Sequence, residues 1–276
     1  MTTFTVENKD GIEFLNSLED NSIDLILTDP PYIISKESGM NKFVDEVAKL
    51  DASGKNKKTE EEWVVFKEKK GYVNDDYKTN YIKYGNTSGN KYAFKTDFGK
   101  WDKEFTIEKL EEFVKLFYKK LRKGGTCIIF FDLWKLETLK AIMERAKTKK
   151  NGFKQIRFIE WVKTNPMPLN QKINYLTNCR EVALLGVKGG NPTFNSKYDK
   201  GIYEFPIQGG KSRIHPTQKS LPLFEELIKK HSNEGDLILD PFLGGGTTAF
   251  ACKNTNRRFI GCEIDVKYVD IIKESL

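Results

Sequence analysis

The chain has 276 residues, of which 38% are hydrophobic, 31% are charged and 12% are aromatic. This length is enough for a large α/β domain with its own core, and the composition excludes a disordered chain and a small disulfide scaffold. The net charge of +7 favours an anionic partner but says nothing about the fold.

The chain also lacks the signals of a membrane or secreted protein. No stretch approaches the roughly 18 consecutive apolar residues of a membrane span, and the first residues do not form a signal peptide. We therefore expect an intracellular, cytoplasmic protein with no membrane partner. Because the four cysteines have no CxxC spacing and only two histidines are present, we expect no metal site.

The first expected elements are a helix over residues 11–18 and a buried strand over residues 22–28. The strand stops at Asp29-Pro30-Pro31-Tyr32, since a double proline cannot continue it. Between residues 36 and 98 the apolar pattern gives way to charged and polar residues, glycine and tyrosine. We predict that residues 36–98 form an insertion or a mobile loop, with a helical piece around residues 60–70.

Strands and helices alternate along the rest of the chain. The expected strands cover residues 126–131, 158–162, 181–187, 236–239 and 258–261. The expected helices cover residues 107–121, 133–147, 221–231 and a stretch from Thr247. We expect Lys123-Gly124-Gly125 to close the first of these helices. The alternation predicts an α/β fold with a doubly wound, mostly parallel sheet covered on both faces, in a single domain spanning residues 1–276.

The positive charge is concentrated in one segment. Residues 145–213 contain 14 basic and 4 acidic residues, a net charge of +10, whereas residues 1–35 carry a net charge of −6. A basic segment of this size is either a solvated lysine-rich face or a surface for an anionic partner. Charge alone leaves both interpretations open.

Three motifs carry chemical groups at the ends of expected elements. Asp29-Pro30-Pro31-Tyr32 follows a buried strand, where ligands bind in doubly wound folds. The stretch Asp240-Pro241-Phe242-Leu243-Gly244-Gly245-Gly246-Thr247-Thr248 joins a strand to a helix, and its glycines allow close backbone approach to a nucleotide or a carboxylate. It is not the dinucleotide fingerprint, which disfavours a nicotinamide oxidoreductase. Arg213-Ile214-His215-Pro216-Thr217-Gln218-Lys219-Ser220 precedes an amphipathic helix and, taken alone, is typical of a basic loop with a helix cap.

Together these motifs resemble those of the amino-methyltransferases that modify exocyclic amines of DNA bases with S-adenosylmethionine. Asp29-Pro30-Pro31-Tyr32 is similar to their catalytic D-P-P-Y, residues 240–248 to their cofactor loop D-P-F-x-G-x-G-T-T, and residues 215–219 to their H-P-T-Q-K. The stretch Trp161-Val162-Lys163-Thr164-Asn165-Pro166-Met167-Pro168 also matches. Because the catalytic motif precedes the cofactor loop, the order resembles that of the β class. The resemblance covers most of the chain and implies a Rossmann-like methyltransferase fold with inserted DNA-recognition segments.

The resemblance implies a role for individual residues. Asp29 and the carbonyl of Pro30, in the motif completed by Pro31, would accept the two N–H groups of the target amine, and Tyr32 would stack on a flipped base. S-adenosylmethionine would be the cofactor. Its ribose would bind Glu263, its methionine end Thr217 and Lys219, and its adenine end Asp10, although Asp10 is equally suited to capping the first helix. Its surroundings would include Asp240, Phe242, Gly244, Gly246 and Thr247.

DNA recognition is expected outside the shared core. In β-class relatives the target-recognition region lies between the Trp-Val-Lys and His-Pro-Thr stretches, which here places it in residues 163–213, within the basic segment. The insertion of residues 36–98 would lie near the active site. Contacts to phosphates and bases are expected from Lys163, Asn165, Lys172, Arg180, Lys211 and Arg213. Further implied partners are a cognate restriction endonuclease and a second copy of the chain in a homodimer.

The sequence therefore predicts a site-specific DNA methyltransferase that acts on the N6 amine of adenine, as in restriction-modification systems. N4-cytosine methylation remains an alternative, because Asp29 favours adenine without deciding the base. An RNA amino-methyltransferase is disfavoured by the late position of the cofactor loop. A nucleic-acid-binding module with an inactive cofactor site is disfavoured by the presence of Asp29, Gly244, Gly246 and Glu263.

Overall fold

The computed structural model describes residues 4–33, 53–54, 57–87, 105–148, 151–166, 176–208 and 218–276. The chain divides into two compact units. We call Met1–Tyr32 together with Phe105–Leu276 the sheet unit, and Ile33–Glu104 the insert unit. The insertion expected over residues 36–98 therefore lies within the insert unit.

An eight-stranded sheet organises the sheet unit. In spatial order its strands are β1 (Phe4–Asn8), β8 (Arg258–Glu263), β7 (Leu237–Asp240), β2 (Ile23–Thr28), β3 (Leu121–Phe131), β5 (Arg180–Val187), β4 (Lys154–Lys163) and β6 (Ile202–Phe205). The first five run parallel, β5 is antiparallel to both of its neighbours, and β6 runs parallel to β4. The predicted α/β fold with a mostly parallel sheet is confirmed.

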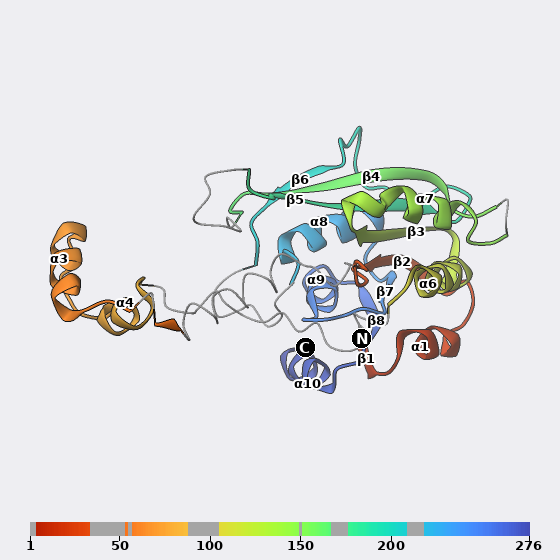
Figure 1. Cartoon of the computed structure of the whole chain (residues 1–276). Coiled ribbons are helices and arrows are strands. Elements are labelled where there is room, and N and C mark those ends of the chain that lie inside the picture. The colour runs from red at the N-terminus through yellow and green to blue at the C-terminus, as the bar shows by residue number, and fades with distance from the viewer. Residues whose placement is uncertain are drawn as a thin grey trace. The chain divides into compact units, whose positions relative to one another are not determined.

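Helices cover both faces of the sheet (Figure 1). One layer consists of α1 (Gly11–Ser17), α6 (Ile107–Lys120) and α7 (Leu136–Glu144), and the other of α8 (Leu221–His231), α9 (Thr247–Asn254) and α10 (Val266–Ser275). Strands buried on both faces carry continuous apolar runs, as β2 and β3 do. No helix in the described part of the chain is long and apolar enough to cross a membrane.

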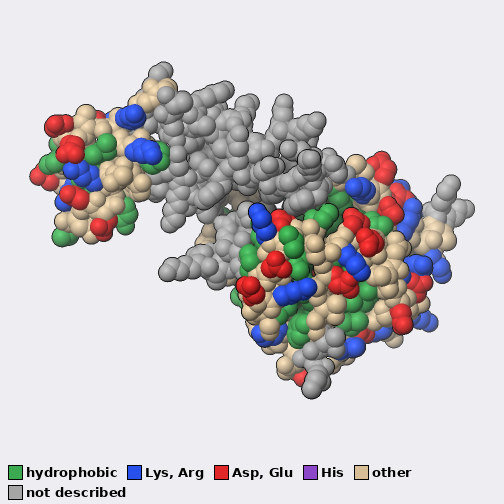
Figure 2. Space-filling model, turned by 90° about the horizontal axis from the view of Figure 1, so that it is seen from below, with side chains coloured by type: hydrophobic (Ala, Val, Ile, Leu, Met, Phe, Trp, Pro, Cys, Tyr) green, Lys and Arg blue, Asp and Glu red, His purple; other side chains and the backbone are tan. Residues whose placement is uncertain are grey.

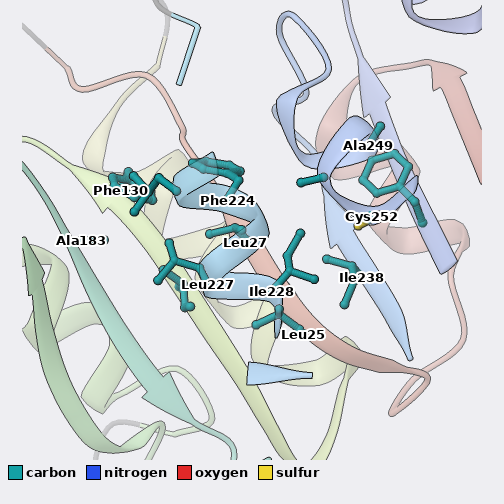
Figure 3. Close-up of a cluster of buried hydrophobic side chains, with 14 of the residues drawn as sticks. Leu25, Leu27, Phe130, Ala183, Phe224, Leu227, Ile228, Ile238, Ala249 and Cys252 are labelled. Carbon is teal, nitrogen blue, oxygen red and sulfur yellow. The ribbon is translucent and has the colours of Figure 1, made fainter. Parts of the chain in front are cut away.

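The core between α8 and the sheet holds the central strands in place. Phe224, Leu227 and Ile228 of α8 point toward side chains of β2 and β3, as Figure 3 shows. The rings of Phe130 on β3 and Phe224 stack with their centroids 5.6 Å apart. Burying each such side chain stabilises the fold by roughly 1.5–3 kcal/mol. This packing fixes the strands whose carboxyl ends carry the polar motifs.

The junction between α6 and β3 differs from the prediction. The helix ends at Lys120 and the strand begins at Leu121, so the glycines expected to close the helix lie inside the strand. Ile23 pairs with Leu121 but Leu25 pairs with Thr126, which shows that residues 122–125 bulge out of the ladder. Gly124 takes the positive φ of +81° that this bulge requires.

The helix predicted over residues 133–147 is shorter than expected. A 3-10 turn, η1 (Leu133–Lys135), precedes α7, and α7 ends at Glu144. The carbonyl of Met143 accepts hydrogen bonds from the N–H groups of Ala146 and Phe153 at 3.3 and 2.9 Å, which turns the chain back toward β4. Tertiary packing therefore ends this helix before its amphipathic pattern does.

Four elements were not predicted: β1, β6, α10 and α4 (Lys78–Tyr84). The two strands lie at the edges of the sheet, where each pairs with a single neighbour. Edge strands need no continuous apolar run, because one side of each is not enclosed by the sheet. Short, mixed sequences such as Phe4–Asn8 therefore carried no clear periodicity.

The insert unit contains two helices in its described part. α3 (Glu60–Lys70) is the helical piece predicted around residues 60–70; it begins with a capping box formed by Thr59 and Glu62. The ring centroid of Tyr81 on α4 lies 5.5 Å from that of Trp63 and 4.3 Å from that of Phe66, both on α3. The Trp63 indole donates a hydrogen bond of 3.0 Å to Asp75 Oδ1. This small aromatic core packs α3 against α4.

Candidate active site

The carboxyl ends of β2, β7 and β8 meet at one edge of the sheet. Asp29 follows β2, Asp240 ends β7 and Glu263 ends β8. Parallel pairing aligns Ile26 with Leu239 and Asp240 with Gly261, so the three strands end side by side. Three carboxylates that are distant in sequence therefore lie along the edge at which ligands bind in doubly wound folds.

Asp29 has one occupied and one open carboxylate oxygen. Its Oδ2 lies 2.9 Å from Lys219 Nζ. Its Oδ1 is buried and has no hydrogen-bond partner among the described residues, a state shared only by the hydroxyls of Thr126 and Ser220. Burial raises the pKa of Asp29, and the Lys219 ammonium opposes that rise. A buried, unpaired acceptor of this kind is suited to an N–H group of a bound molecule.

Lys219 connects the catalytic motif to the middle of the sheet. The residue is 7% exposed. Its Nζ lies 2.6 Å from Glu181 Oε2 and 3.0 Å from the Tyr32 hydroxyl, in addition to its contact with Asp29. Burial alone would lower the pKa of Lys219, but Asp29 and Glu181 outweigh it and hold the pKa well above its ordinary value. Lys219 is therefore a buried cation between two carboxylates.

Glu181 is a member of this site that the sequence analysis did not select. Its second oxygen, Oε1, lies 2.7 Å from Lys163 Nζ. Burial would raise the pKa of Glu181, but the ammonium groups of Lys219 and Lys163 lower it to about 2. The available signal was a charged residue near the start of the otherwise apolar strand Arg180–Val187.

Tyr32 is held by contacts on several sides. Its ring meets that of Phe131 edge-on, with the centroids 5.9 Å apart, and Lys219 Nζ lies 5.2 Å from its ring centroid. Its backbone carbonyl accepts a hydrogen bond of 3.0 Å from Lys135 Nζ. Pro30 is buried, and Pro31 and Tyr32 are half-buried. The four residues of the motif thus lie at the end of β2, where the sequence pattern predicts them. Their contact with Lys219 was not predicted, since that residue was expected at the methionine end of the cofactor.

Asp240 accepts hydrogen bonds from both β2 and the first turn of α9. Its Oδ1 accepts hydrogen bonds from the Thr28 hydroxyl at 2.7 Å and from the Phe242 N–H at 3.0 Å, and its Oδ2 accepts one from the Thr248 hydroxyl at 2.5 Å. Burial raises its pKa to about 6 despite these bonds. Since both oxygens are used inside the protein, Asp240 shapes the glycine loop that follows it.

The pKa of Asp240 predicts a pH dependence of stability. Because the pKa rises from 3.8 to about 6 on folding, the native state binds this proton more tightly than the unfolded chain. Protonated Asp240 therefore contributes up to about 3 kcal/mol to the free energy of unfolding below pH 3.8. This contribution is lost as the pH rises to about 6. Urea unfolding of the natural protein and of Asp240→Asn across about pH 4–7 should diverge by this amount. Parallel curves for the two proteins would contradict the prediction.

The glycine loop between β7 and α9 forms a cradle. Gly244 and Gly246 have φ angles of +51° and +84°. A Cβ on Gly246 would lie 2.8 Å from Ile272 Cγ1 and 2.9 Å from Phe250 Cε2. No side chain caps the N-terminus of α9, where the buried Thr247 begins the helix. Backbone N–H groups in the first turn of α9 can therefore approach a ligand closely.

Glu263 lies beside this cradle. Its Oε2 accepts a hydrogen bond of 2.8 Å from the Gly244 N–H, and its Oε1 accepts one of 2.9 Å from the Asp265 N–H. Burial raises its pKa. A carboxylate has about four lone-pair sites, so both oxygens can still accept hydroxyl groups of a sugar.

Two further predicted cofactor residues have clear local roles. Asp10 Oδ1 accepts hydrogen bonds from the N–H groups of Ile12 and Glu13 at 2.9 and 3.3 Å, which caps α1. Phe242 packs against Phe113, with the ring centroids 4.5 Å apart. Asp10 follows β1, the neighbour of β8, so the structure brings it to the same edge of the sheet as Glu263.

The predicted DNA contacts are only partly within the described residues. Thr217, from the cofactor set, and Lys172, Lys211 and Arg213, from the DNA set, lie outside them. Asn165 Oδ1 accepts a hydrogen bond of 2.7 Å from the Ile207 N–H. Arg180 Nε lies 3.0 Å from Glu160 Oε1, and its side chain is 64% exposed. Lys163 differs from the expectation of a phosphate contact, because its side chain is 15% exposed and its ammonium pairs with Glu181.

The fold and the site define a class of protein. The model of the DNA methylase family, which joins N6 and N4 methylases, matches residues 23–274. The chain belongs to this family. The prediction of a DNA amino-methyltransferase from the order of the motifs is therefore confirmed, and the oxidoreductase is excluded.

Individual relatives agree with this assignment. The chain is 26% identical to the type II methyltransferase M2.DpnII of Streptococcus pneumoniae, over 98% of this chain and 88% of that protein. It is 28% identical to the type II methyltransferase M.HpaI of Haemophilus parainfluenzae, over 96% of this chain and 72% of that protein. The crystal structure of the M1.HpyAVI–SAM complex is similar with a TM-score of 0.60 and 26% identity, over 99% of this chain and 100% of the other.

Proposed function

We propose that this enzyme transfers a methyl group from S-adenosylmethionine to the N6 amine of an adenine within a specific DNA sequence. The observation that carries the proposal is the open Oδ1 of Asp29, buried beside the occupied Oδ2. The amine of adenine is a weak nucleophile, because its lone pair is delocalised into the ring. A carboxylate oxygen that accepts one N–H group draws the nitrogen toward a tetrahedral geometry and frees that lone pair.

The rest of the motif fits the same role. The Pro30 carbonyl would accept the second N–H group of the amine. The ring of Pro30 fixes the backbone between the two acceptors, and Pro31 restricts the conformation of Pro30. The ring of Tyr32, held by Phe131 and Lys219, would stack on the base after it leaves the duplex. The proposed catalytic residues would thus align the amine and stack on the base; they are Asp29, Pro30, Pro31 and Tyr32.

The cradle at β7, β8 and α9 fits S-adenosylmethionine. When bound, this cofactor supplies an electrophilic methyl group. Gly244 and Gly246 allow close approach of the backbone, and Glu263 would accept the ribose hydroxyls. Asp10, Thr217, Lys219, Asp240, Phe242 and Thr247 complete the proposed surroundings. The similar M1.HpyAVI structure is a complex with SAM, which supports this choice.

We propose that target recognition involves residues 163–213. Basic and acidic side chains are intermixed on the face of the larger body in Figure 2, which does not favour that face for a phosphate backbone. Of the two described basic candidates, Arg180 has the more exposed side chain, at 64% against 15% for Lys163. Lys172, Lys211, Arg213 and Asn165 remain the other proposed contacts.

Arg180 provides a test of the DNA surface. If Arg180 contacts a phosphate, Arg180→Ala should lower the slope of log binding constant against log salt concentration by about one unit. Fluorescence anisotropy with a labelled duplex at several salt concentrations measures this slope. Lys140→Ala is a matched control, because Lys140 is 54% exposed and also pairs with a glutamate, Glu144. Equal slopes for Arg180→Ala and the natural protein would remove Arg180 from the proposed interface.

The chemical product tests the proposed reaction. The protein is incubated with duplex DNA and methyl-labelled S-adenosylmethionine, and the DNA is digested to nucleosides for mass analysis. N6-methyladenine is the expected product. Label found only in N4-methylcytosine would overturn the choice of base, and the absence of label from the DNA would overturn the proposed activity.

The type II relatives also support a biological context. We propose that the enzyme acts in the cytoplasm, where bacterial or phage DNA lies, within a restriction-modification system and beside a cognate endonuclease. A homodimer remains part of this proposal. Sequencing of modified bases in an expressing host would reveal the target site.

A further inference from the structure

We infer that Glu181 is a positioning residue for methyl transfer: through Lys219 it keeps Asp29 oriented with Oδ1 open to the target amine. The inference rests on the proposed function of Asp29. It assigns a role to a residue of β5 that lies outside the catalytic motif and the glycine loop.

The argument begins with an alternating row of four charges. Asp29 Oδ2, Lys219 Nζ, Glu181 Oε2 and, through Oε1, Lys163 Nζ follow one another at distances of 2.9, 2.6 and 2.7 Å. All four side chains are at most 21% exposed. Each carboxylate oxygen in the row contacts an ammonium group except Asp29 Oδ1. The row therefore ends on the oxygen that the reaction needs.

Glu181 decides where the Lys219 ammonium lies. An ammonium group has three donors, and here they meet Asp29 Oδ2, Glu181 Oε2 and the Tyr32 hydroxyl. Without the Glu181 carboxylate, the donor released from it could turn to the unpaired Asp29 Oδ1. The lysine would then occupy both oxygens of Asp29 and compete with the amine.

The sheet holds Glu181 rigidly in this place. β5 is flanked by β3 and β4, and Glu181 pairs directly with Trp161 of β4. Lys163, two residues further along β4, takes Glu181 Oε1 and so leaves Oε2 to Lys219. Catalytic geometry depends on such supporting groups, because a displacement of about 1 Å can cost about 100-fold in rate.

A purely stabilising role explains this row poorly. Two carboxylates and two ammonium groups taken out of water pay a large desolvation cost, and well-packed apolar residues often stabilise such a position as well or better. The row is adjacent to the open oxygen of Asp29 and shares its only described cation. A positioning role accounts for both its charge and its place.

The row predicts opposite pH shifts for two variants. Among the described residues, the charged and titratable groups around Asp29 are Lys219, Glu181 and Tyr32, with Asp240 beyond Thr28. Glu181→Gln removes a negative charge that disfavours ionised Asp29, so the acid limb of the kcat profile should move to lower pH. Lys163→Met removes a positive charge, so the same limb should move to higher pH.

The experiment measures kcat and KM for DNA across about pH 5–8, with saturating cofactor. Glu181→Gln should lower the maximal kcat by about 10- to 100-fold, with little change in KM. Glu181→Asp, which keeps the charge but shortens the side chain, should lower kcat and leave the acid limb in place. Glu111→Gln is the matched control, because Glu111 also pairs with two cations, Lys115 at 3.0 Å and Arg145 at 2.9 Å.

The outcomes separate the inference from the proposed function. An active natural protein whose Glu181→Gln variant keeps its kcat, or whose two charge variants shift the acid limb in the same direction, would overturn the positioning role. An inactive natural protein would instead overturn the proposed function. If Glu181→Gln does not fold, the direction of the shift in Lys163→Met still decides the inference.

Discussion

Replacement of Asp29 by alanine is expected to lower kcat for DNA methylation by about 1,000-fold. The variant loses the only side-chain acceptor proposed for the target amine, the Oδ1 atom that is buried without a partner in the described structure. Cofactor affinity should change by no more than a few-fold, since the glycine loop and Glu263 remain. Single-turnover methylation and calorimetric titration with S-adenosylmethionine measure the two quantities separately.

Asp29→Asn should lie between the natural protein and the alanine variant. Its amide oxygen can still accept an N–H group, but it carries no charge to stabilise the developing positive charge on the amine. Asp270→Ala serves as a control, because it removes an exposed carboxylate from α10. If Asp29→Ala methylated DNA within tenfold of the natural rate, the acceptor role would be wrong.

Gly246→Ala is expected to weaken cofactor binding by at least about tenfold. The added Cβ would approach the side chains of Ile272 and Phe250 to within 2.8 and 2.9 Å, at a φ of +84° that alanine adopts only with strain. The strain amounts to about 1–2 kcal/mol, and its relief would tilt the first turn of α9 away from the cradle. Calorimetric titration with S-adenosylmethionine gives the affinity, and urea unfolding gives the stability.

Gly235→Ala separates backbone strain from the shape of the site. Gly235 has a φ of +81°, nearly that of Gly246, but a Cβ there would meet nothing within 4 Å. Gly235→Ala should have a backbone strain similar to that of Gly246→Ala, and so a similar loss of stability, but it should keep its affinity for the cofactor. A Gly246→Ala variant that binds as tightly as Gly235→Ala would show that the glycine is needed only for its φ angle.

Local pattern was sufficient for most elements of the fold. α3 and α8 match the ranges expected for them, because each carries a local helix signal: α3 begins with a capping box, and α8 has an amphipathic pattern. β2 and β3 read as apolar runs, since both faces of each are covered by helices. The edge strands β1 and β6 were not predicted. α7 ends before its predicted end, where the Met143 carbonyl accepts a hydrogen bond from the Phe153 N–H. Those features depend on neighbours that are remote in the sequence.

The candidate site divides in the same way. Asp29-Pro30-Pro31-Tyr32, Lys219, the glycine loop and Glu263 could be selected from the sequence, because each belongs to a continuous motif or ends an expected strand. Glu181 was not selected, since the signal within its own strand, a charged residue near the start, is equally typical of a solvated carboxylate.

The roles of individual basic residues likewise depend on the three-dimensional structure. By itself the sequence determined the family, the order of the motifs and the concentration of positive charge in residues 145–213. Only the tertiary structure showed that Lys163, counted within that charge, neutralises a buried carboxylate rather than facing solvent. The physical reason is that an ion pair depends on distance in space, and the antiparallel strand β5 brings Glu181 to Lys163 and to Lys219, which lies 38 residues further along the chain.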